Sequence, residues 1–516
     1  MRKVELKKQL YCILIYLFCF IHMQAEQPDF KIKGFHLDLR SQVITMPALK
    51  SFVKELADFN INTLIMEWEA TFPYQENATL SNKYAYKPEE VKDLINYCTS
   101  LGIDVIPIHQ CFGHVEWILR HDRYYYLSED KKDVSQVCPL KEDEAISVFR
   151  SLFKELAAYH PSKYFHIGGD ETNLLGLCDK CKVKVAKEGK SKLFVDYIKA
   201  ICGIVTEMGK TPVLWADIIL KYPEAIAEMP KNTIYIDWNY GWQINRFGDM
   251  QKLYDAGVVM WGAPALRSSP DNMHITEWVK HFENQCDYIP YARKAGYEGI
   301  IMTSWSNSGQ YSFLYDIGMG WEIQDMEQIR NVYPLNGFRI LLAAYAKSVN
   351  QIEPINLENF VVSYAQNRFG LKKNDGEILW NVLYQRQKLV RNGIVKGGQS
   401  VAEELNLIIK SRDQLYKIKP RKNKKEFEHF KLMLDIRANY LKFKDIESKY
   451  ESKSYNRSQS KEIYENLNLV LNEEKKIDKR FFSLQKGFLN DEEIRKLNEI
   501  RKRKMIVVRD FLKAQL

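Results

Sequence analysis

The stretch from Tyr164 to Asn173 reads YFHIGGDETN. A short apolar run ends in two glycines, and the adjacent acids Asp170 and Glu171 follow at once. A short, continuously apolar run bounded by glycine is typical of a strand buried on both faces of a parallel sheet. Neighbouring carboxylates repel, and each raises the pKa of the other. At the end of a strand they are therefore either solvated loop acids or part of a functional site.

The same pattern recurs on both sides of this stretch. Similar runs are GFHLDL from Gly34, INTLIMEW from Ile61, GIDVIPIHQ from Gly102, TPVLWAD from Thr211, TIYIDWNY from Thr233, GVVMWGAP from Gly257 and GIIMTSWS from Gly299. Apolar residues at helical spacing separate them, in segments that begin at Met46, Pro88, Glu144 and Ser191. Eight strands alternating with helices predict the α/β class and a (β/α)8 TIM barrel, with a doubly wound open sheet as the alternative.

Polar or aromatic residues follow nearly every predicted strand. They are Asp38, Arg40, Glu67, Glu69, Gln110, His114, Asp170, Glu171, Trp215, Asp217, Asp237, Trp238, Tyr240, Trp261 and Trp305. In a barrel the carboxyl ends of all strands meet at one face, where barrel enzymes build their active sites. This convergence favours the barrel over the open sheet.

Three regions divide the 516 residues. Residues 1–25 resemble a signal peptide, because a basic start precedes the apolar run Leu10–Met23 and cleavage is plausible after Ala25. Export to a periplasm, the extracellular space or a secretory lumen is expected, with a retained membrane anchor as the alternative. Residues 26–340 are predicted to form the catalytic barrel. Residues 341–516, rich in Lys, Glu, Leu and Ile, predict a helical C-terminal region.

The remaining composition narrows the class of site. A net charge of +9 is mild for this length, so no nucleic-acid partner is expected, and no segment after the signal is apolar enough for stable membrane insertion. Of the nine cysteines, Cys178 and Cys181 form the one close pair. They are a local disulfide, half a zinc site or two free thiols, and without a matching second pair no metal and no cofactor are expected.

Carboxylates among tryptophans suit a carbohydrate site. Indole rings pack on the apolar face of a sugar, while acids bind hydroxyl groups. Cleavage of a glycosidic bond needs an acid that protonates the leaving oxygen and a group that stabilises positive charge at the anomeric carbon. Asp170 and Glu171, at the end of the predicted fourth strand, can supply both.

On these residues the sequence resembles glycoside hydrolase family 20, the β-N-acetylhexosaminidases. HIGGDE within residues 164–171 is similar to the family signature, and the similarity to the hexosaminidase D branch rests on further motifs in the order that the barrel requires. These motifs are HLDLR from His36, LIMEWEATFPY from Leu64, YAYKPEE from Tyr84, IPIHQCFGHVEWILRH from Ile106, VLWAD from Val213 and IMTSWSNSGQYS from Ile301. They cover about residues 34–320.

The resemblance implies an exo-acting enzyme that retains configuration through substrate assistance, an exception to the two-carboxylate scheme. The 2-acetamido oxygen of the substrate attacks the anomeric carbon and forms an oxazolinium intermediate. Glu171 would be the general acid and then the base, with a raised pKa, and Asp170 would orient the acetamido group. The implied partner is a glycan with a terminal 2-acetamido sugar.

The resemblance also implies substrate-binding roles. Trp215, Trp238 and Trp305 would line the acetamido pocket, Tyr240 would donate to the acetamido oxygen, and His114 and Asp38 match further motif positions. Two departures concern the sugar hydroxyls: Lys33-Gly34 replaces the family's Arg-Gly, with Arg40 as a substitute, and Trp305-Ser306-Asn307 replaces Trp-x-Glu, with Asn307 or Asp316 as a substitute. These departures leave the choice between GlcNAc and GalNAc as substrate open, and the resemblance to the hexosaminidase D branch favours GalNAc.

Two other functions remain open from the sequence. A non-catalytic glycan-binding barrel would keep the tryptophans but would not need the paired acids. A retaining glycosidase with a protein nucleophile would need a second carboxylate about 5 Å from the acid. Glu67, Glu69 and Asp237 are the candidates for that nucleophile.

Overall fold

A computed structural model describes residues 29–306, 332–391 and 393–516. Its main sheet has the order β1-β2-β3-β4-β5-β6-β7-β9, all parallel, and pairing of β1 with β9 closes it into a barrel. The barrel strands are β1 Ile32–Asp38, β2 Thr63–Glu67, β3 Asp104–Ile108, β4 Tyr164–His166, β5 Thr211–Trp215, β6 Ile234–Trp238, β7 Val259–Ala263 and β9 Gly299–Ser304. The predicted (β/α)8 barrel is therefore confirmed, and each predicted run contains a strand.

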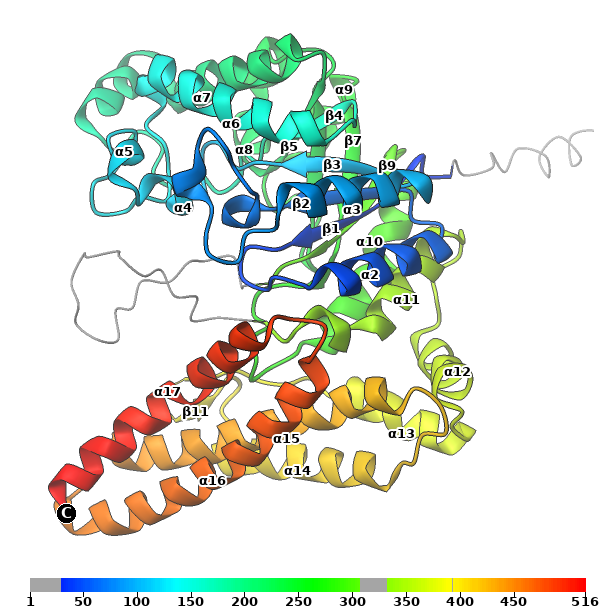
Figure 1. Ribbon diagram of the computed structural model, residues 1–516, viewed down its shortest axis with the longest axis vertical. Helices are drawn as coiled ribbons and strands as arrows, with labels where there is room; N and C mark the ends of the chain where they lie inside the picture. Colours follow the sequence, from blue (N-terminus) through cyan, green and yellow to red (C-terminus); the bar gives the residue numbers. More distant parts are fainter. Residues whose placement is uncertain (1–28, 307–331, 392) are drawn as a thin grey trace, which may run out of the picture.

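Helices surround the barrel, as Figure 1 shows in blue to green. They are α2 Met46–Asp58, α3 Pro88–Ser100, α4 Glu116–Leu119, α5 Asp122–Tyr125, α6 Glu142–Tyr159, α7 Asp179–Glu207, α8 Asp217–Lys221, α9 Gln251–Asp255 and α10 Trp278–Lys294. A short strand, β8 Ala265–Arg267, pairs with β9. Gly189, with φ 87°, kinks α7, so the helix expected from Ser191 follows this kink.

Apolar side chains fill the barrel from inside and outside. On β2 the side chain of Ile65 joins the interior cluster, whereas Leu64 and Met66 pack outward against the helices. The interior cluster continues through Ile106, Trp215 and other strand residues. This alternation explains why each strand is almost continuously apolar, because both of its faces are buried.

The C-terminal region is helical, as predicted, and lies beside the barrel (Figure 1). Its helices are α11 Arg339–Val349, α12 Leu357–Phe369, α13 Lys373–Leu383, α14 Val401–Lys417, α15 Lys424–Tyr450, α16 Ser460–Gln485 and α17 Asp491–Gln515, with a hairpin of β10 Val390–Arg391 and β11 Ile394–Val395. Glu493 at the start of α17 accepts the backbone N–H of Val43 at 3.0 Å and so ties this region to the barrel. Within the described residues no helix is long and apolar enough to cross a bilayer.

Candidate active site

Two glycines direct the acid pair into the carboxyl end of the barrel. After β4 the chain passes through Gly168 and Gly169, whose φ angles are 73° and 88°. A Cβ atom at Gly168 would lie 1.8 Å from Oε1 of Gln110, so a side chain here would have to displace the Gln110 amide. The turn ends at Glu171, whose φ of 46° is itself in the left-handed region. Asp170 and Glu171 both line one cavity as a result.

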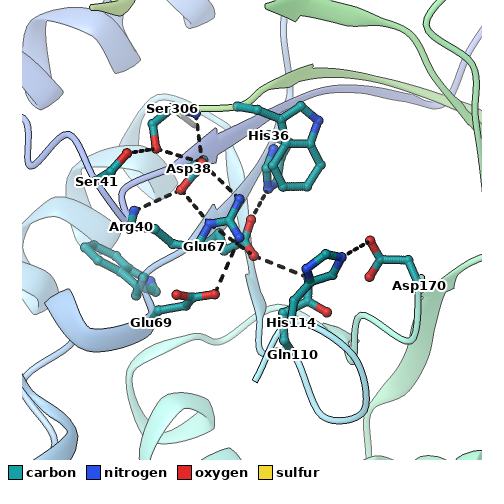
Figure 2. Close-up of polar contacts among 12 residues, drawn as sticks. His36, Asp38, Arg40, Ser41, Glu67, Glu69, Gln110, His114, Asp170 and Ser306 are labelled. Atoms are coloured by element: carbon teal, nitrogen blue, oxygen red, sulfur yellow. Dashed lines mark hydrogen bonds and ion pairs between the residues drawn. The ribbon is translucent and has the colours of Figure 1, made fainter. Parts of the chain in front are cut away.

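His114 joins the loop after β3 to the acid pair. Its Nε2 atom lies 3.4 Å from Oδ2 of Asp170 and 3.3 Å from Oε2 of Glu171, and Figure 2 shows the contact with Asp170. A Cβ atom at the preceding Gly113 would lie 2.5 Å from the backbone oxygen of Asp170, so the two loops touch. Burial would lower the pKa of His114, but the charge and hydrogen bond of Asp170 and the hydrogen bond of Glu171 raise it well above its usual value.

The same contact changes the expected ionisation of Glu171. A raised pKa was predicted from the sequence, and in this structure that prediction is wrong. The hydrogen bond from His114 lowers the pKa of Glu171 and outweighs the opposing effect of burial. The Glu171 side chain is 45 % exposed, whereas that of Asp170 is 10 % exposed, so Glu171 is the acid nearer the solvent.

Asp217 lies behind the acid pair. It accepts the backbone N–H of Glu171 at 3.1 Å and the indole N–H of Trp238 at 3.2 Å. Burial, together with the charge of Asp170, raises the pKa of Asp217 to about 7. Asp217 thus has a pKa well above that of an ordinary carboxyl group, and its two hydrogen bonds connect Glu171 to Trp238 of the aromatic wall.

Aromatic side chains form the walls of the cavity, whose volume is about 330 Å³. Its lining residues are Arg40, Gln110, His114, Asp170, Glu171, Trp215, Trp238, Tyr240, Trp242, Arg246, Ser268, Ser269 and Trp305. The ring centroids of Trp215 and Trp305 are 6.1 Å apart, and the hydroxyl of Tyr240 accepts the Trp305 indole N–H at 2.9 Å. The three predicted tryptophans and Tyr240 thus share one pocket with the acids.

Arg40 lines the cavity, and Asp38 binds its guanidinium group (Figure 2). The guanidinium donates from Nε to Asp38 Oδ1 at 3.0 Å and from Nη2 to Oδ2 at 3.1 Å. Ser306 adds donations to Asp38 Oδ2 from its backbone N–H and its hydroxyl, each at 2.8 Å. Burial opposes ionisation, but Arg40 holds the pKa of Asp38 at about 2. Asp38 itself does not line the cavity, so its role is to position Arg40. The guanidinium carbon of Arg40 lies 5.2 Å from the centre of the Trp305 ring.

Of the two departures from the family pattern, the one at Lys33-Gly34 lies within the described residues, and the other includes Asn307, which does not. Lys33 lies near the start of β1, at the opposite end of the strand from Asp38, and pairs with Asp29 at 2.8 Å. Arg40 is thus the cation of this segment that reaches the cavity. Asn307 and Asp316, the candidates of the eighth strand, lie outside the described residues, as does the predicted signal peptide.

None of the three candidate protein nucleophiles lines the cavity. Glu67 is fully buried and contacts His36 Nε2 at 2.8 Å, while Asp237 accepts the hydroxyls of Tyr288 and Tyr297 at 2.6 and 3.0 Å. Glu69 is buried as well, with Oε1 3.8 Å from Arg40 Nη1. Among the described lining residues, Asp170 and Glu171 are the acids.

Several residues that line the cavity were not predicted from the sequence. Trp242 follows Tyr240 by two positions and could have been found as part of the same aromatic segment. Arg246, whose guanidinium carbon lies 4.3 Å from the Trp242 ring centre, had no local signal, and neither did Ser268 and Ser269. They enter the site from long loops, whose course a strand pattern does not predict.

An acid pair in an aromatic cavity, at the carboxyl face of a closed parallel barrel, is the arrangement expected of a glycoside hydrolase. Residues 30–260 match the model of the glycosyl hydrolase family 20 catalytic domain. This part of the barrel is therefore similar to the catalytic domain of glycoside hydrolase family 20, and together with the curated relatives it supports a glycoside hydrolase of the β-N-acetylhexosaminidase class.

The individual relatives share little sequence identity with this chain. Hexosaminidase D of Bos taurus is 26% identical over 55% of this chain and 86% of its own length, and Hexosaminidase D of Homo sapiens is 27% identical over 56% and 63%. A solved β-N-acetylhexosaminidase of Bacteroides fragilis superimposes with a TM-score of 0.47 at 18% identity, over 65% of this chain and 70% of that one. The barrel assignment rests on the strand order, not on this superposition.

Proposed function

We propose that this protein is an exo-acting β-N-acetylhexosaminidase that removes terminal β-linked GalNAc or GlcNAc by a retaining, substrate-assisted mechanism. One observation carries the proposal: Asp170 and Glu171 are adjacent in an aromatic cavity, and no other acid among the described residues lines it. A nucleophile from the substrate accounts for this arrangement, since the candidate protein nucleophiles lie elsewhere.

Asp170 acts on the acetamido group. Its Oδ1 atom is buried and has no hydrogen-bond partner among the described residues, so it can accept the acetamido N–H. This bond orients the acetamido oxygen toward the anomeric carbon, and the carboxylate stabilises the positive charge of the oxazolinium ring. Tyr240, at the wall formed with Trp305, donates its hydroxyl to the acetamido oxygen.

Glu171 moves the proton. As the acetamido oxygen bonds to the anomeric carbon, the glycosidic bond breaks and Glu171 protonates the departing oxygen. Glu171 then accepts a proton from the water that attacks the anomeric carbon, and the oxazolinium ring opens with net retention. His114 and Glu171 share one proton across their 3.3 Å contact, so transfer from imidazolium to carboxylate loads the acid without a change in net charge.

A substrate panel tests this proposal. Aryl β-GlcNAc and β-GalNAc should be hydrolysed, the matched aryl β-glucoside should not, and NMR should show the β-anomer as the first product. A thiazoline analogue of the oxazolinium should inhibit competitively. The ratio of the two kcat/KM values establishes the sugar preference. Glycan binding without turnover, or a trapped covalent glycosyl-enzyme, contradicts the mechanism.

We also propose that the protein is exported, because residues 1–25 have the basic start and apolar run of a signal peptide. N-terminal sequencing of the protein recovered from its native cells tests this. A mature chain that begins at Glu26 supports the proposal, and an intact Met1 contradicts it.

A further inference from the structure

Three cysteines and one glutamate gather between the loops that carry the catalytic residues. They are Glu129 and Cys138, from the segment that follows β3, and Cys178 and Cys181, from the segment that follows β4. One ligand atom from each lies within 4.8 Å of all the others. Cys138, Cys181 and Glu129 are buried, and Cys178 is partly buried.

The sulfur spacings match a tetrahedral thiolate site. Sγ of Cys138 lies 3.8 Å from Sγ of Cys178 and 3.7 Å from Sγ of Cys181. With Zn–S bonds of about 2.3 Å, tetrahedral geometry places neighbouring sulfurs about 3.8 Å apart. A disulfide would require about 2.05 Å. Oε2 of Glu129 lies 3.4 Å from Sγ of Cys181, close enough to be the fourth ligand.

The backbone holds both halves of the cluster in place. Ser128 and Val137 form an antiparallel bridge, and Cys138 N–H donates to the Leu127 oxygen at 2.8 Å, so Glu129 and Cys138 lie side by side. In the other half, Cys178 caps α7 and its sulfur accepts the Cys181 N–H at 3.4 Å. The halves meet where Cys178 N–H donates to Oε1 of Glu129 at 2.8 Å.

We propose that Glu129, Cys138, Cys178 and Cys181 bind one structural Zn²⁺ ion. Thiolate-rich tetrahedral sets select zinc, and four protein ligands leave no position for a substrate, as in closed structural sites. The sequence indicated only the Cys178–Cys181 half of the site. The other two ligands lie 40 or more positions upstream and do not form a second CxxC motif.

The metal site connects the segment after β3, which carries His114, to the segment after β4, which carries Asp170 and Glu171. The segment that carries Cys138 also pairs with the His114 turn, since Val137 N–H donates to the Phe112 oxygen at 2.9 Å. Its Gln136 accepts the backbone N–H of Leu174, three residues after Glu171, at 2.9 Å. Zinc therefore stabilises the relative position of His114 and the acid pair without touching the sugar.

Metal analysis of the whole protein tests the proposal. The enzyme, purified without chelators, should contain about one Zn²⁺ per chain, as a closed four-ligand site requires. Cys181→Ser should lose the zinc, and Glu129→Gln should bind it more weakly, whereas Cys286→Ser, a thiol on α10, should keep it. Zinc content that is unchanged in Cys181→Ser overturns the assignment.

A second measurement does not depend on how the variants fold. Wild-type protein stripped of zinc and loaded with Co²⁺ should show thiolate-to-cobalt charge-transfer bands and the intense visible bands of a tetrahedral site. Removal of the metal should also lower the Tm, because binding contributes to folding. A chain with no zinc, no cobalt spectrum and a disulfide between Cys138 and Cys178 after peptide mapping would show that these cysteines are not a metal site.

Discussion

The Nε2 atom of His114 lies 3.3 Å from Oε2 of Glu171, and the same nitrogen is 3.4 Å from Asp170. The imidazole therefore shares its positive charge between the two carboxylates, which would otherwise repel each other across adjacent residues. This contact raises the pKa of His114 and lowers that of Glu171. Both shifts favour a proton on the imidazole over a proton on Glu171.

His114→Gln should narrow the pH range of activity from the alkaline side. In the wild type, His114 and Glu171 together hold one proton until the pH passes the raised pKa of His114. In the variant Glu171 must hold that proton alone, and a carboxyl group loses it at lower pH. The alkaline limb of kcat/KM should therefore move to lower pH, as measured on an aryl 2-acetamido glycoside. His121→Gln, which lies outside the cavity lining, should keep the wild-type limb, and an unmoved limb in His114→Gln contradicts the shared proton.

Glu171→Gln should lower kcat by about 10²–10⁴, the usual contribution of a general acid–base. The loss should be smaller for an aryl glycoside with a highly acidic phenol, because that leaving group needs little protonation. Steady-state kinetics on two aryl substrates of different leaving-group pKa measure the difference. Glu144→Gln on the exposed face of α6 is the matched control. Equal losses on both substrates would mean that Glu171 does not protonate the leaving oxygen.

Asp170→Asn should lower kcat on 2-acetamido substrates by about 10²–10³, as expected when one electrostatic stabiliser of a transition state is removed. The neutral amide can no longer stabilise a positive oxazolinium. The thiazoline analogue should therefore also bind more weakly, and inhibition constants provide the second readout. Asp143→Asn at the exposed start of α6 serves as control. Undiminished thiazoline affinity would exclude Asp170 as the acetamido partner.

Arg40→Met should lower the free energy of unfolding by about 3–5 kcal/mol at neutral pH, because it leaves the buried Asp38 carboxylate without its cation. Arg40 lowers the folded-state pKa of Asp38 to about 2. Its contribution is thus fully present above the unfolded pKa of about 3.9 and is lost as the pH falls toward 2.

The deficit of Arg40→Met should accordingly shrink below about pH 4. Urea denaturation of wild type and variant at neutral and acidic pH measures it. Arg495→Met, at an exposed arginine of α17 whose nearest acid is 4.0 Å away, should change stability little at either pH. A deficit that is independent of pH would assign the loss to packing rather than to the ion pair.

Gly168→Ala should destabilise the protein more than Gly102→Ala. Both glycines have left-handed φ angles, 73° and 76°, so both variants should lose about 1–2 kcal/mol through backbone strain. At Gly168 the new Cβ also meets Gln110, whereas nothing lies within 4 Å at Gly102. The difference in Tm between the variants isolates this contact, and equal Tm values would show that the loop after β4 can relax.

The strand pattern predicted more of the fold than of the site. Runs such as Thr211–Trp215 were found because burial on both faces makes a barrel strand apolar throughout, and this is a local property. Asp170, Glu171 and the tryptophans were found because they directly follow such strands. Asp217 was predicted as a residue at a strand end, but its bonds to Glu171 and Trp238 depend on how the loop after β4, the start of α8 and the end of β6 meet.

The amino-acid sequence by itself determined the alternation of strands and helices, the position of Asp170 and Glu171 after a buried strand, and the family resemblance. Only the tertiary structure decided that His114 lies between the acids, that Asp38 positions Arg40, and that Glu129 and Cys138 meet Cys178 and Cys181. Periodicity records whether a residue is buried in its own element. Contacts between residues many positions apart depend on loop conformation and on barrel closure, and no local pattern encodes these.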